Sequence, residues 1–408
     1  MRAGRWKTLV SSLDDPYPVY HELRSEGTVL RGAPGQWLVL GHAETSAALR
    51  DVRTSVDPTK AQRINIAPSP GAREARPRVG QLDSQAPRDR LFSLIRLDPP
   101  DHTRLRTHVS KAFTVRAIES VRPFVQQTVD ELLDRAAVRG ELDLVNDFGY
   151  ELSVNVIGHL LGVPSHQRAM VAHWSEQLIR ILNAPASPSA HVQAERQAIA
   201  QSRDYFTDLI AQRRADPRDD LLGRLIQMVE EEQITMRELL SLVLLLIAAG
   251  HETVVKLISS GALALANSPD QFELLRNDPS LIEDAVEEFL RFEPPVQIVI
   301  RFMTDDVELG GKRITKGSQL AIIIGAANRD PSVFADPDRL DIRRQDNRHL
   351  SFAAGIHFCL GASLARLEAQ VALGSLVGRY PRLDVLTDRV ERLQNLVLRG
   401  LTSLPVRL

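Results

Sequence analysis

A long apolar segment near the middle of the chain limits how the chain can fold. Residues 239–249 are apolar apart from Ser241, and His251, Glu252 and Lys256 interrupt the continuation. A membrane span needs about 20 predominantly apolar residues, whereas shorter apolar runs are typical of buried core helices. We therefore expect a buried helix here and no membrane span.

This predicted helix has a defined beginning and end. Residues 235–238 resemble a capping box, in which a hydroxyl and a carboxylate satisfy free N–H groups at a helix start. Ser268-Pro269 stops the helix after about Asn267. At 1.5 Å per residue the helix would be about 48 Å long. Its middle is apolar on all sides, so the rest of the chain must pack around it.

The rest of the chain is predicted to be mainly α-helical with small β-sheets. Helical patterns cover about residues 104–139 and 193–214, and further helices are expected from Asp278-Pro279 to before Pro294 and over about 360–379. Strand signals are few, and they cover residues 36–40, a hairpin over 307–314 around Gly310-Gly311, and residues 320–324.

Two segments are predicted loops. Residues 66–87 hold four prolines and two glycines, and residues 183–190 read NAPASPSA. Long loops in compact proteins often act as lids or binding loops, and a merely mobile surface loop is an equally open interpretation. Without a repeat or a clear linker, we expect one unit over residues 1–408, with a β-rich part over about 1–65 and a helical core over about 90–380.

Charge and cysteine content narrow the function classes. The net charge is -2, with no clustered basic stripe, which argues against nucleic-acid binding. One cysteine cannot form an internal disulfide, and the N-terminus lacks the apolar core of a signal peptide. These features predict a cytoplasmic protein.

The single cysteine stands in a distinctive loop. Cys359 lies between Gly355 and Gly361, two residues after His357 and just before a predicted helix. Glycines allow unusual backbone conformations or close approaches, and a helix N-terminus stabilises a thiolate. From these residues alone, a buried structural cysteine remains open. A haem-free cysteine enzyme with His357 as base is a further alternative, although a spacing of two residues on a tight loop gives it poor geometry.

The longer pattern carries a family resemblance. Phe352-x-x-Gly355-x-His357-x-Cys359-x-Gly361, followed by Leu364-Ala365-Arg366, closely resembles the haem-binding loop of the cytochrome P450 family. The resemblance implies haem b held between the long central helix and the helix after the cysteine. It also implies that Cys359 is the thiolate ligand, with Phe352 beside its sulfur. Ala353 departs from the family's usual glycine, and alanine is small enough for the loop to form.

A second motif lies in the central helix. Ala249-Gly250-His251-Glu252-Thr253 resembles the oxygen-binding groove of the same family, in which Glu252 and Thr253 would relay protons to dioxygen and Ala249 would face the haem. A kinked helix with a satisfied polar pair is the alternative interpretation. Val254 and Lys256 stand where related sequences often have threonine and asparagine.

A third motif pairs an acid with an arginine. Glu288 and Arg291 are spaced for one helix face, and alone they read as an ordinary surface ion pair. With Pro294-Pro295 behind them they match the family's Glu-x-x-Arg helix, which implies a buried ion-pair network supporting the cysteine loop.

The resemblance also implies partners for the two haem propionates and for a substrate. Buried anions need cationic or donor partners. The matching positions for the propionates are His102, Arg106, Arg301 and His357. Those expected to line the substrate pocket are Leu245, Ala248, Ala249, Val296 and Ile298, with Phe92 and Leu94 as weaker candidates.

Taken together, the resemblance implies a bacterial-type haem-thiolate monooxygenase. It would insert one oxygen atom of O2 into a hydrophobic small molecule, by hydroxylation or epoxidation in secondary metabolism, and act as a monomer. Electrons would come from NAD(P)H through a ferredoxin and its reductase, and the candidate docking charges are Lys111, Arg343, Arg344 and Arg348. The alternatives are a haem enzyme of the same fold that uses peroxide or couples substrates oxidatively, and a non-catalytic haem sensor or carrier.

Overall fold

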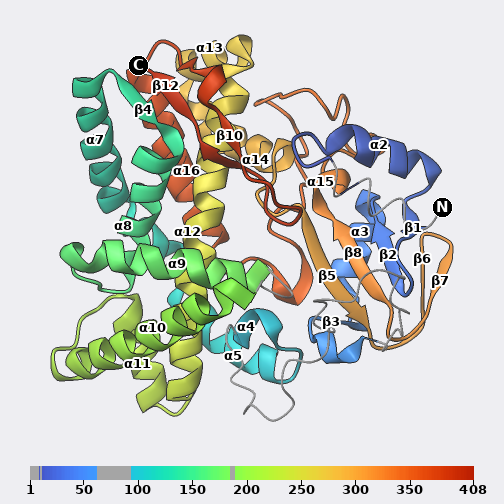
Figure 1. The fold of residues 1–408 in the computed structure, drawn as a ribbon, viewed down its shortest axis with the longest axis horizontal. Coiled ribbons are helices and arrows are strands. Elements are labelled where there is room, and N and C mark those ends of the chain that lie inside the picture. Colours follow the sequence, from blue (N-terminus) through green and yellow to red (C-terminus); the bar gives the residue numbers. More distant parts are fainter. Residues whose placement is uncertain (1–8, 10–11, 62–92, 184–188) are drawn as a thin grey trace.

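The computed structural model describes residues 9, 12–61, 93–183 and 189–408. The predicted loop over residues 66–87 and the candidate Phe92 lie outside the described residues. Figure 1 shows a helical part on one side and a sheet-containing part on the other. Mainly helical structure with small sheets confirms the predicted fold class.

The central helix α12 runs through the middle of the helical part (Figure 1). It spans Met236–Ala266, and its 31 residues make it about 46 Å long. The predicted capping box is present at Thr235 and Glu238. By length and composition α12 could cross a membrane, but 67% of its most apolar window is buried inside the structure, as in a core helix.

Other helices surround α12. It packs against α8, α9 and α16 and against the π-helical segment η3. The surrounding helical elements are α4 Ser93–Arg96, α5 Asp101–Val109, α6 Val115–Glu119, α7 Arg122–Arg139, η3 Leu144–Tyr150, α8 Glu151–Leu160, α9 Arg168–Asn183, α10 Ser189–Ala215, α11 Leu221–Glu230, α13 Pro269–Asn277, α14 Ile282–Phe292 and α16 Ala362–Arg379. Their apolar faces form one continuous core with the buried residues of α12.

The second part is built on a five-stranded sheet. Its strand order is β1-β2-β8-β5-β3, with β2 and β8 parallel and the other neighbours antiparallel. The strands are β1 Val29–Arg31, β2 Gln36–Val39, β3 Thr54–Ser55, β5 Ile298–Met303 and β8 Gln319–Ile323. The hairpin of β6 Val307–Leu309 and β7 Lys312–Ile314 confirms the prediction around Gly310-Gly311.

Side chains alternate between the two faces of this sheet, and apolar residues are buried on both faces. Leu38 and Ala321 pack on the face covered by α2 (Tyr17–Glu26). Trp37 and Leu320 pack on the opposite face with Ala48 and Leu49 of α3 (His42–Arg50). A last short helix, α15 (Ile324–Ala327), follows β8 directly. The sheet therefore has its own apolar clusters, separate from the core around α12.

The end of the chain closes the helical part. Strand β12 (Pro405–Arg407) pairs with β4 (Glu141–Asp143) on one side and with β9 (Asp384–Val385) on the other. Strands β10 (Glu391–Arg392) and β11 (Leu401–Ser403) form a separate antiparallel pair. Leu401, Leu404 and Val406 are fully buried in the helical core.

Three sequence predictions about boundaries need correction. The predicted helix over 104–139 is broken into α5, α6 and α7, because Thr114 caps a new helix start by accepting from the N–H of Ala117. Part of the predicted loop over 183–190 is helical, since α9 ends at Asn183 and α10 begins at Ser189. Asp278 caps a 3-10 turn rather than α14 itself, which begins at Ile282.

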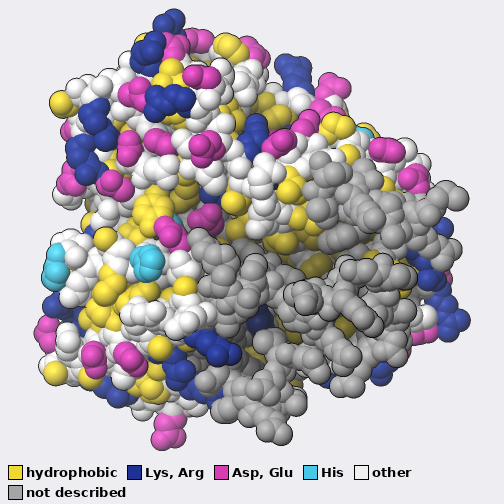
Figure 2. Space-filling view, viewed as in Figure 1, with side chains coloured by type: hydrophobic (Ala, Val, Ile, Leu, Met, Phe, Trp, Pro, Cys, Tyr) yellow, Lys and Arg dark blue, Asp and Glu magenta, His cyan; other side chains and the backbone are white. Residues whose placement is uncertain are grey.

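Charged side chains of both signs lie on the face shown in Figure 2. Figure 2 shows acidic and basic groups interspersed over the described part of one face, rather than gathered by sign.

Candidate active site

The single cysteine lies in a loop that two contacts fix. A 3-10 turn over Gly355–His357 precedes it, and α16 follows it. The backbone N–H of Cys359 donates to the carbonyl oxygen of Phe352 over 2.9 Å, which closes the loop. Gly355 has φ +70°, and a Cβ built there would lie 2.7 Å from the carbonyl oxygen of Leu49. Glycine at this position therefore lets the loop pack on α3.

Two other small residues of the loop behave differently. Ala353 adopts the left-handed conformation with φ +58°, and its N–H donates to the carbonyl oxygen of Leu350 over 2.8 Å. The loop thus forms with alanine, as expected, at a backbone cost of about 1 kcal/mol. At Gly361, no described atom comes within 4 Å of a built Cβ, so the neighbouring protein atoms do not explain the glycine.

The surroundings of Cys359 act on its thiol in two directions. Desolvation raises the pKa of the thiol above its usual value, and the N–H of Gly361 and the charges of Arg106 and Arg366 offset this rise only in part. Arg106 donates to the carbonyl oxygen of Phe358 over 2.7 Å, which places its guanidinium beside the loop. Cationic neighbours and N–H donors favour the thiolate, the form in which cysteine binds a metal.

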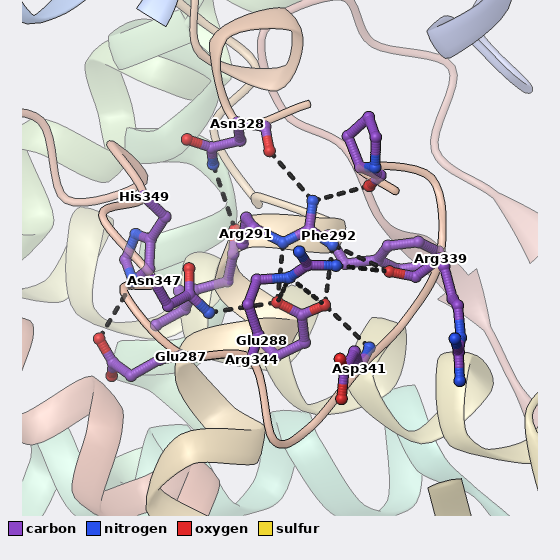
Figure 3. A network of polar contacts seen from close by, with 12 residues as sticks. Glu287, Glu288, Arg291, Phe292, Asn328, Arg339, Asp341, Arg344, Asn347 and His349 are labelled. Atoms are coloured by element: carbon purple, nitrogen blue, oxygen red, sulfur yellow. Dashed lines mark hydrogen bonds and ion pairs between the residues drawn. The ribbon is translucent and has the colours of Figure 1, made fainter. Parts of the chain in front are cut away.

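Figure 3 shows a network of polar contacts centred on the buried acid Glu288. Glu288 and Arg291 of α14 form two hydrogen bonds of 2.7 and 2.8 Å, and neither side chain is exposed. Arg344 donates to both carboxylate oxygens of Glu288, at 3.1 and 3.2 Å. Glu288 also accepts from the backbone N–H of Asp341 and from Asn347.

The network reaches the cysteine loop through Asn328. Arg291 donates to the carbonyl oxygen of Asn328 over 3.1 Å. The Asn328 amide in turn donates to Ser351 and accepts from the N–H of Leu350 at the start of the loop, over 2.8 Å in each case. The predicted supporting role of the Glu-x-x-Arg pair therefore has a continuous set of contacts behind it.

A second link joins α14 to the helix after the cysteine. Arg366 of α16 donates to both carboxylate oxygens of Glu287, at 2.6 and 2.7 Å, and His349 lies 3.1 Å from the same carboxylate. The Arg366 guanidinium stands 4.6 Å from the ring centre of Phe352. These contacts place the Arg366 guanidinium against Phe352, whose carbonyl oxygen closes the cysteine loop.

The place of Arg344 corrects one sequence prediction. Its side chain is only 9% exposed and is committed to Glu288, so it is a structural residue rather than a free docking charge. The other three candidates, Lys111, Arg343 and Arg348, are exposed.

The four predicted donor residues come from two elements and the cysteine loop. His102 and Arg106 lie on α5, Arg301 on β5, and His357 in the turn before the cysteine. The rings of His102 and His357 are 4.3 Å apart, centre to centre. Burial, followed by the charges of Arg301, His102 and Arg106, lowers the pKa of His357 to about 3.

These four residues, the donor cluster, have little negative charge around them with which to pair. Burial lowers the pKa of Arg301 to about 10, with Asp98 acting in the opposite direction. His102 is 1% exposed, and neither of its ring nitrogens has a hydrogen-bond partner among the described residues. Buried polar groups without partners are costly and normally find one. The cluster therefore fits a ligand that carries buried anionic groups, such as the two carboxylates of a haem.

The middle of α12 carries the second predicted motif. The helix is continuous through Ala249–Thr253. The hydroxyl of Thr253 donates to the carbonyl oxygen of Ala249 over 2.9 Å. The carboxylate of Glu252 pairs with Lys256 over 2.9 Å. A Cβ built at Gly250 would make only ordinary contact with Ile157, so glycine leaves room there without being forced by crowding.

Comparison with known proteins decides the family. A family model described as Cytochrome P450 matches residues 70–400, a range that includes the cysteine loop, the donor cluster and the motif in α12. The chain belongs to the cytochrome P450 family. Membership implies a haem with a thiolate ligand, and this P450 is a monooxygenase.

Relatives of this P450 cover nearly its whole length. Cytochrome P450 107B1 of Saccharopolyspora erythraea is 41% identical over 375 residues, covering 91% of this chain and 89% of the relative. The 6-deoxyerythronolide B hydroxylase of the same organism is 39% identical over 401 residues, covering 97% and 96%. The crystal structure of P450BioI in complex with an acyl carrier protein ligated to hexadec-9Z-enoic acid has a TM-score of 0.86 at 36% identity, covering 97% of this chain and 99% of that one.

The predicted substrate residues of this P450 divide between the two parts of the fold. Leu245 and Ala248 lie in the core around α12, and Leu94 lies on α4, which packs against α12. Val296 pairs with Leu398 in an isolated β-bridge. Ile298 is buried in the sheet cluster with Leu38 and Tyr20, away from the α12 core.

Several contacts around this site were not found from the sequence. His251 of α12 is buried, and its Nδ1 lies 3.1 Å from the hydroxyl of Ser175, which donates to the carbonyl oxygen of Ile247. Because that hydroxyl hydrogen is committed, His251 donates through Nδ1, and its Nε2 has no partner among the described residues. For Lys256, the spacing of four residues from Glu252 was an available signal. For Arg344 and Ser175 the contacts join distant segments, and no local pattern marks them.

Proposed function

We propose that this P450 inserts one oxygen atom of O2 into an apolar small molecule, with Cys359 as the thiolate ligand of its haem. The proposal rests on two neighbouring features. The chain's single cysteine lies in a loop that hydrogen bonds hold in place, and a buried cluster of donor residues lies next to that loop. When bound, the haem supplies the activation of dioxygen, and a thiolate ligand favours O–O cleavage.

The donor cluster has the role of holding the cofactor's carboxylates. His102 offers two unpartnered ring nitrogens, and Arg106, Arg301 and His357 add donors around it. Pairing with two anions would relieve the shortage of negative charge in this cluster. Phe352 and Gly355 shape the loop, and Glu288 and Arg291 brace it from behind.

Proton transfer is assigned to the motif in α12. Thr253 holds its hydroxyl proton on the carbonyl oxygen of Ala249, and Glu252 offers a carboxylate one residue away on the same helix. General acid and base groups typically accelerate such steps by about 10²–10⁴-fold when they are in reach. Ala249, with its small side chain, leaves space beside the helix for dioxygen.

The electron source is proposed to be NAD(P)H, through a ferredoxin and its reductase. Lys111, Arg343 and Arg348 are exposed and are candidates for meeting an acidic partner. Neutralising these charges should slow electron transfer most at low ionic strength, because salt screens exposed charges.

The substrate is inferred to be hydrophobic and of the secondary-metabolite class. One relative is named a hydroxylase of 6-deoxyerythronolide B, and one similar structure holds an acyl chain on a carrier protein. Leu245, Ala248, Ala249 and Val296 would supply the apolar lining, with Phe92 and Leu94 as weaker candidates. Ile298 becomes a weaker candidate because it is buried in the sheet cluster.

The test is the carbon monoxide difference spectrum of the reduced, haem-loaded protein. A strongly red-shifted Soret band supports a thiolate ligand, and Cys359→Ser should lose that shift while retaining haem. If C359S kept the thiolate-type spectrum, the ligand assignment would be wrong. Product formation with a surrogate ferredoxin and reductase would then separate a monooxygenase from a haem sensor or carrier.

A further inference from the structure

Lys256 occupies an unusual place for a lysine. It lies in the apolar middle of α12 and is only 4% exposed. Its Nζ lies 2.9 Å from a carboxylate oxygen of Glu252, one turn earlier, and donates to the carbonyl oxygen of Leu401 over 2.8 Å. The ammonium thus connects the predicted proton-relay acid to the first residue of β11.

The chain is built closely around this lysine. A Cβ built at Gly400 would lie 2.7 Å from Cγ of Lys256 and 2.9 Å from its Cβ. Only a glycine at 400 lets β11 begin this close to α12 while the lysine stem lies between them. The position of Lys256 is therefore fixed from the strand side as well as from the helix.

Stability alone gives a poor account of this arrangement. Removing an ammonium from water is costly, and one carboxylate partner often fails to offset that cost. An apolar side chain of similar length would suit the surrounding core at least as well. A buried lysine at this position therefore points to a role in the chemistry of the acid that it holds.

Nearby polar side chains are engaged elsewhere. Burial, Glu176 and Glu252, in that order, raise the pKa of Tyr150, so Tyr150 lies near Glu252. Its hydroxyl, however, donates to Glu176 over 3.0 Å. His251 is bonded to Ser175. Within the described residues, Lys256 is the cation placed to pair with Glu252.

We propose that Lys256 is a positioning residue that holds the Glu252 carboxylate toward β11 and so restrains it from passing protons toward Thr253. This inference rests on the proposed proton-relay role of Glu252. Thr253 hydrogen-bonds back to Ala249, in the direction of the helix N-terminus, whereas Lys256 holds Glu252 toward the C-terminus. Glu252 must leave Lys256 before its carboxylate can turn toward Thr253.

The main test uses the haem-loaded protein with a surrogate ferredoxin, its reductase and NADPH, without added substrate. NADPH oxidation and its solvent isotope effect in D2O are measured for wild type, K256M, K256R, E252Q and E252Q/K256M. In K256M the Glu252 carboxylate is no longer restrained, so this variant should oxidise NADPH several-fold faster and with a smaller isotope effect. K256R should return the rate and the isotope effect toward the wild-type values. In the E252Q background, adding K256M should change neither quantity.

Gly400→Ala provides a matched variant that keeps both charges. Its new methyl group displaces the Lys256 stem, so G400A should reproduce the direction of the K256M effect. A slower K256M enzyme would overturn the proposal, as would an equal effect of K256M with and without Glu252, because Lys256 would then act independently of the acid.

A readout independent of turnover keeps this inference separate from the proposed function. Urea unfolding of the same holoenzymes should show that the effects of E252Q and K256M are not additive, since each change removes the same ion pair. Additive effects would mean that the pair does not form. Loss of the thiolate-type spectrum in wild type would instead contradict the proposed function while leaving the unfolding cycle interpretable.

Discussion

Arg344 places its Nε 3.1 Å from the carboxylate of Glu288, a group that Arg291 already holds through two hydrogen bonds. Two arginines from distant segments thus share one buried acid. The segment around Arg344 also folds back on itself, since this guanidinium donates to the carbonyl oxygen of Ala335 over 2.7 Å. The cysteine loop consequently rests on a charge network rather than on apolar packing alone.

The first prediction compares two neighbouring arginines. Arg344→Ala should lower the free energy of unfolding by about 3 kcal/mol, because it removes one partner of a buried ion-pair network. Arg343→Ala, at an exposed position, should change it by no more than about 0.5 kcal/mol. Thermal or urea unfolding of the haem-loaded proteins measures both. Equal effects of the two changes would contradict the structural role of Arg344.

The second prediction concerns the hydroxyl of Thr253. Thr253→Ala should uncouple electron use from product, with peroxide released instead and product formation reduced by roughly 10²-fold. Thr253→Ser retains a hydroxyl and should keep most of the coupling. Product and peroxide are measured per NADPH consumed. Wild-type coupling in T253A would show that the hydroxyl is not needed for proton transfer.

The third prediction follows from the burial of His251. Burial lowers its pKa from 6.5 to about 4, so the folded state resists protonation that the unfolded state accepts. The unfolded chain therefore binds more protons between these two pH values, and stability is lost as the pH falls through that range. The His251→Gln variant has no titrating imidazole at this position, so it lacks this pH-dependent contribution to stability. Urea unfolding should show that the stability difference between wild type and H251Q shrinks from about pH 7 to about pH 5. A constant difference would mean that His251 does not titrate in this way.

The fourth prediction tests the left-handed residue of the cysteine loop. Ala353→Gly removes a steric cost of about 1 kcal/mol in the folded state, although glycine also gives the unfolded chain more freedom. We expect a small net gain in stability, up to about 1 kcal/mol. Thermal unfolding of the holoenzyme measures the gain, and a loss of stability in A353G would show that the methyl group of Ala353 makes a contact that outweighs the strain.

Much of this fold could be predicted because its signals are local. The capping box at Thr235, the glycine pair at residues 310–311 and the cysteine motif each lie within a few residues of the sequence. Helix boundaries were less well predicted, because helical periodicity continues across the cap at Thr114. A hydroxyl that accepts one N–H can restart a helix without any proline or glycine to mark the break.

The motifs of the candidate site could be proposed from the sequence, but the residues that hold those motifs in place could not. Arg344 reads as a surface charge in sequence, and only the fold brings it against Glu288. The link from Lys256 to Leu401 joins residues 145 positions apart. Side chains alternate between the two faces of the sheet along β5, so the face on which Ile298 lies depends on the sheet register. The sequence of residues 296–300 does not determine that register.

The strand β12 has a consequence for how the protein is made. Val406 is completely buried and pairs across to Leu142, a residue synthesised much earlier. The last part of the helical core is therefore complete only after residue 406 has been synthesised, so the apolar surface that Val406 covers has no partner in a shorter nascent chain.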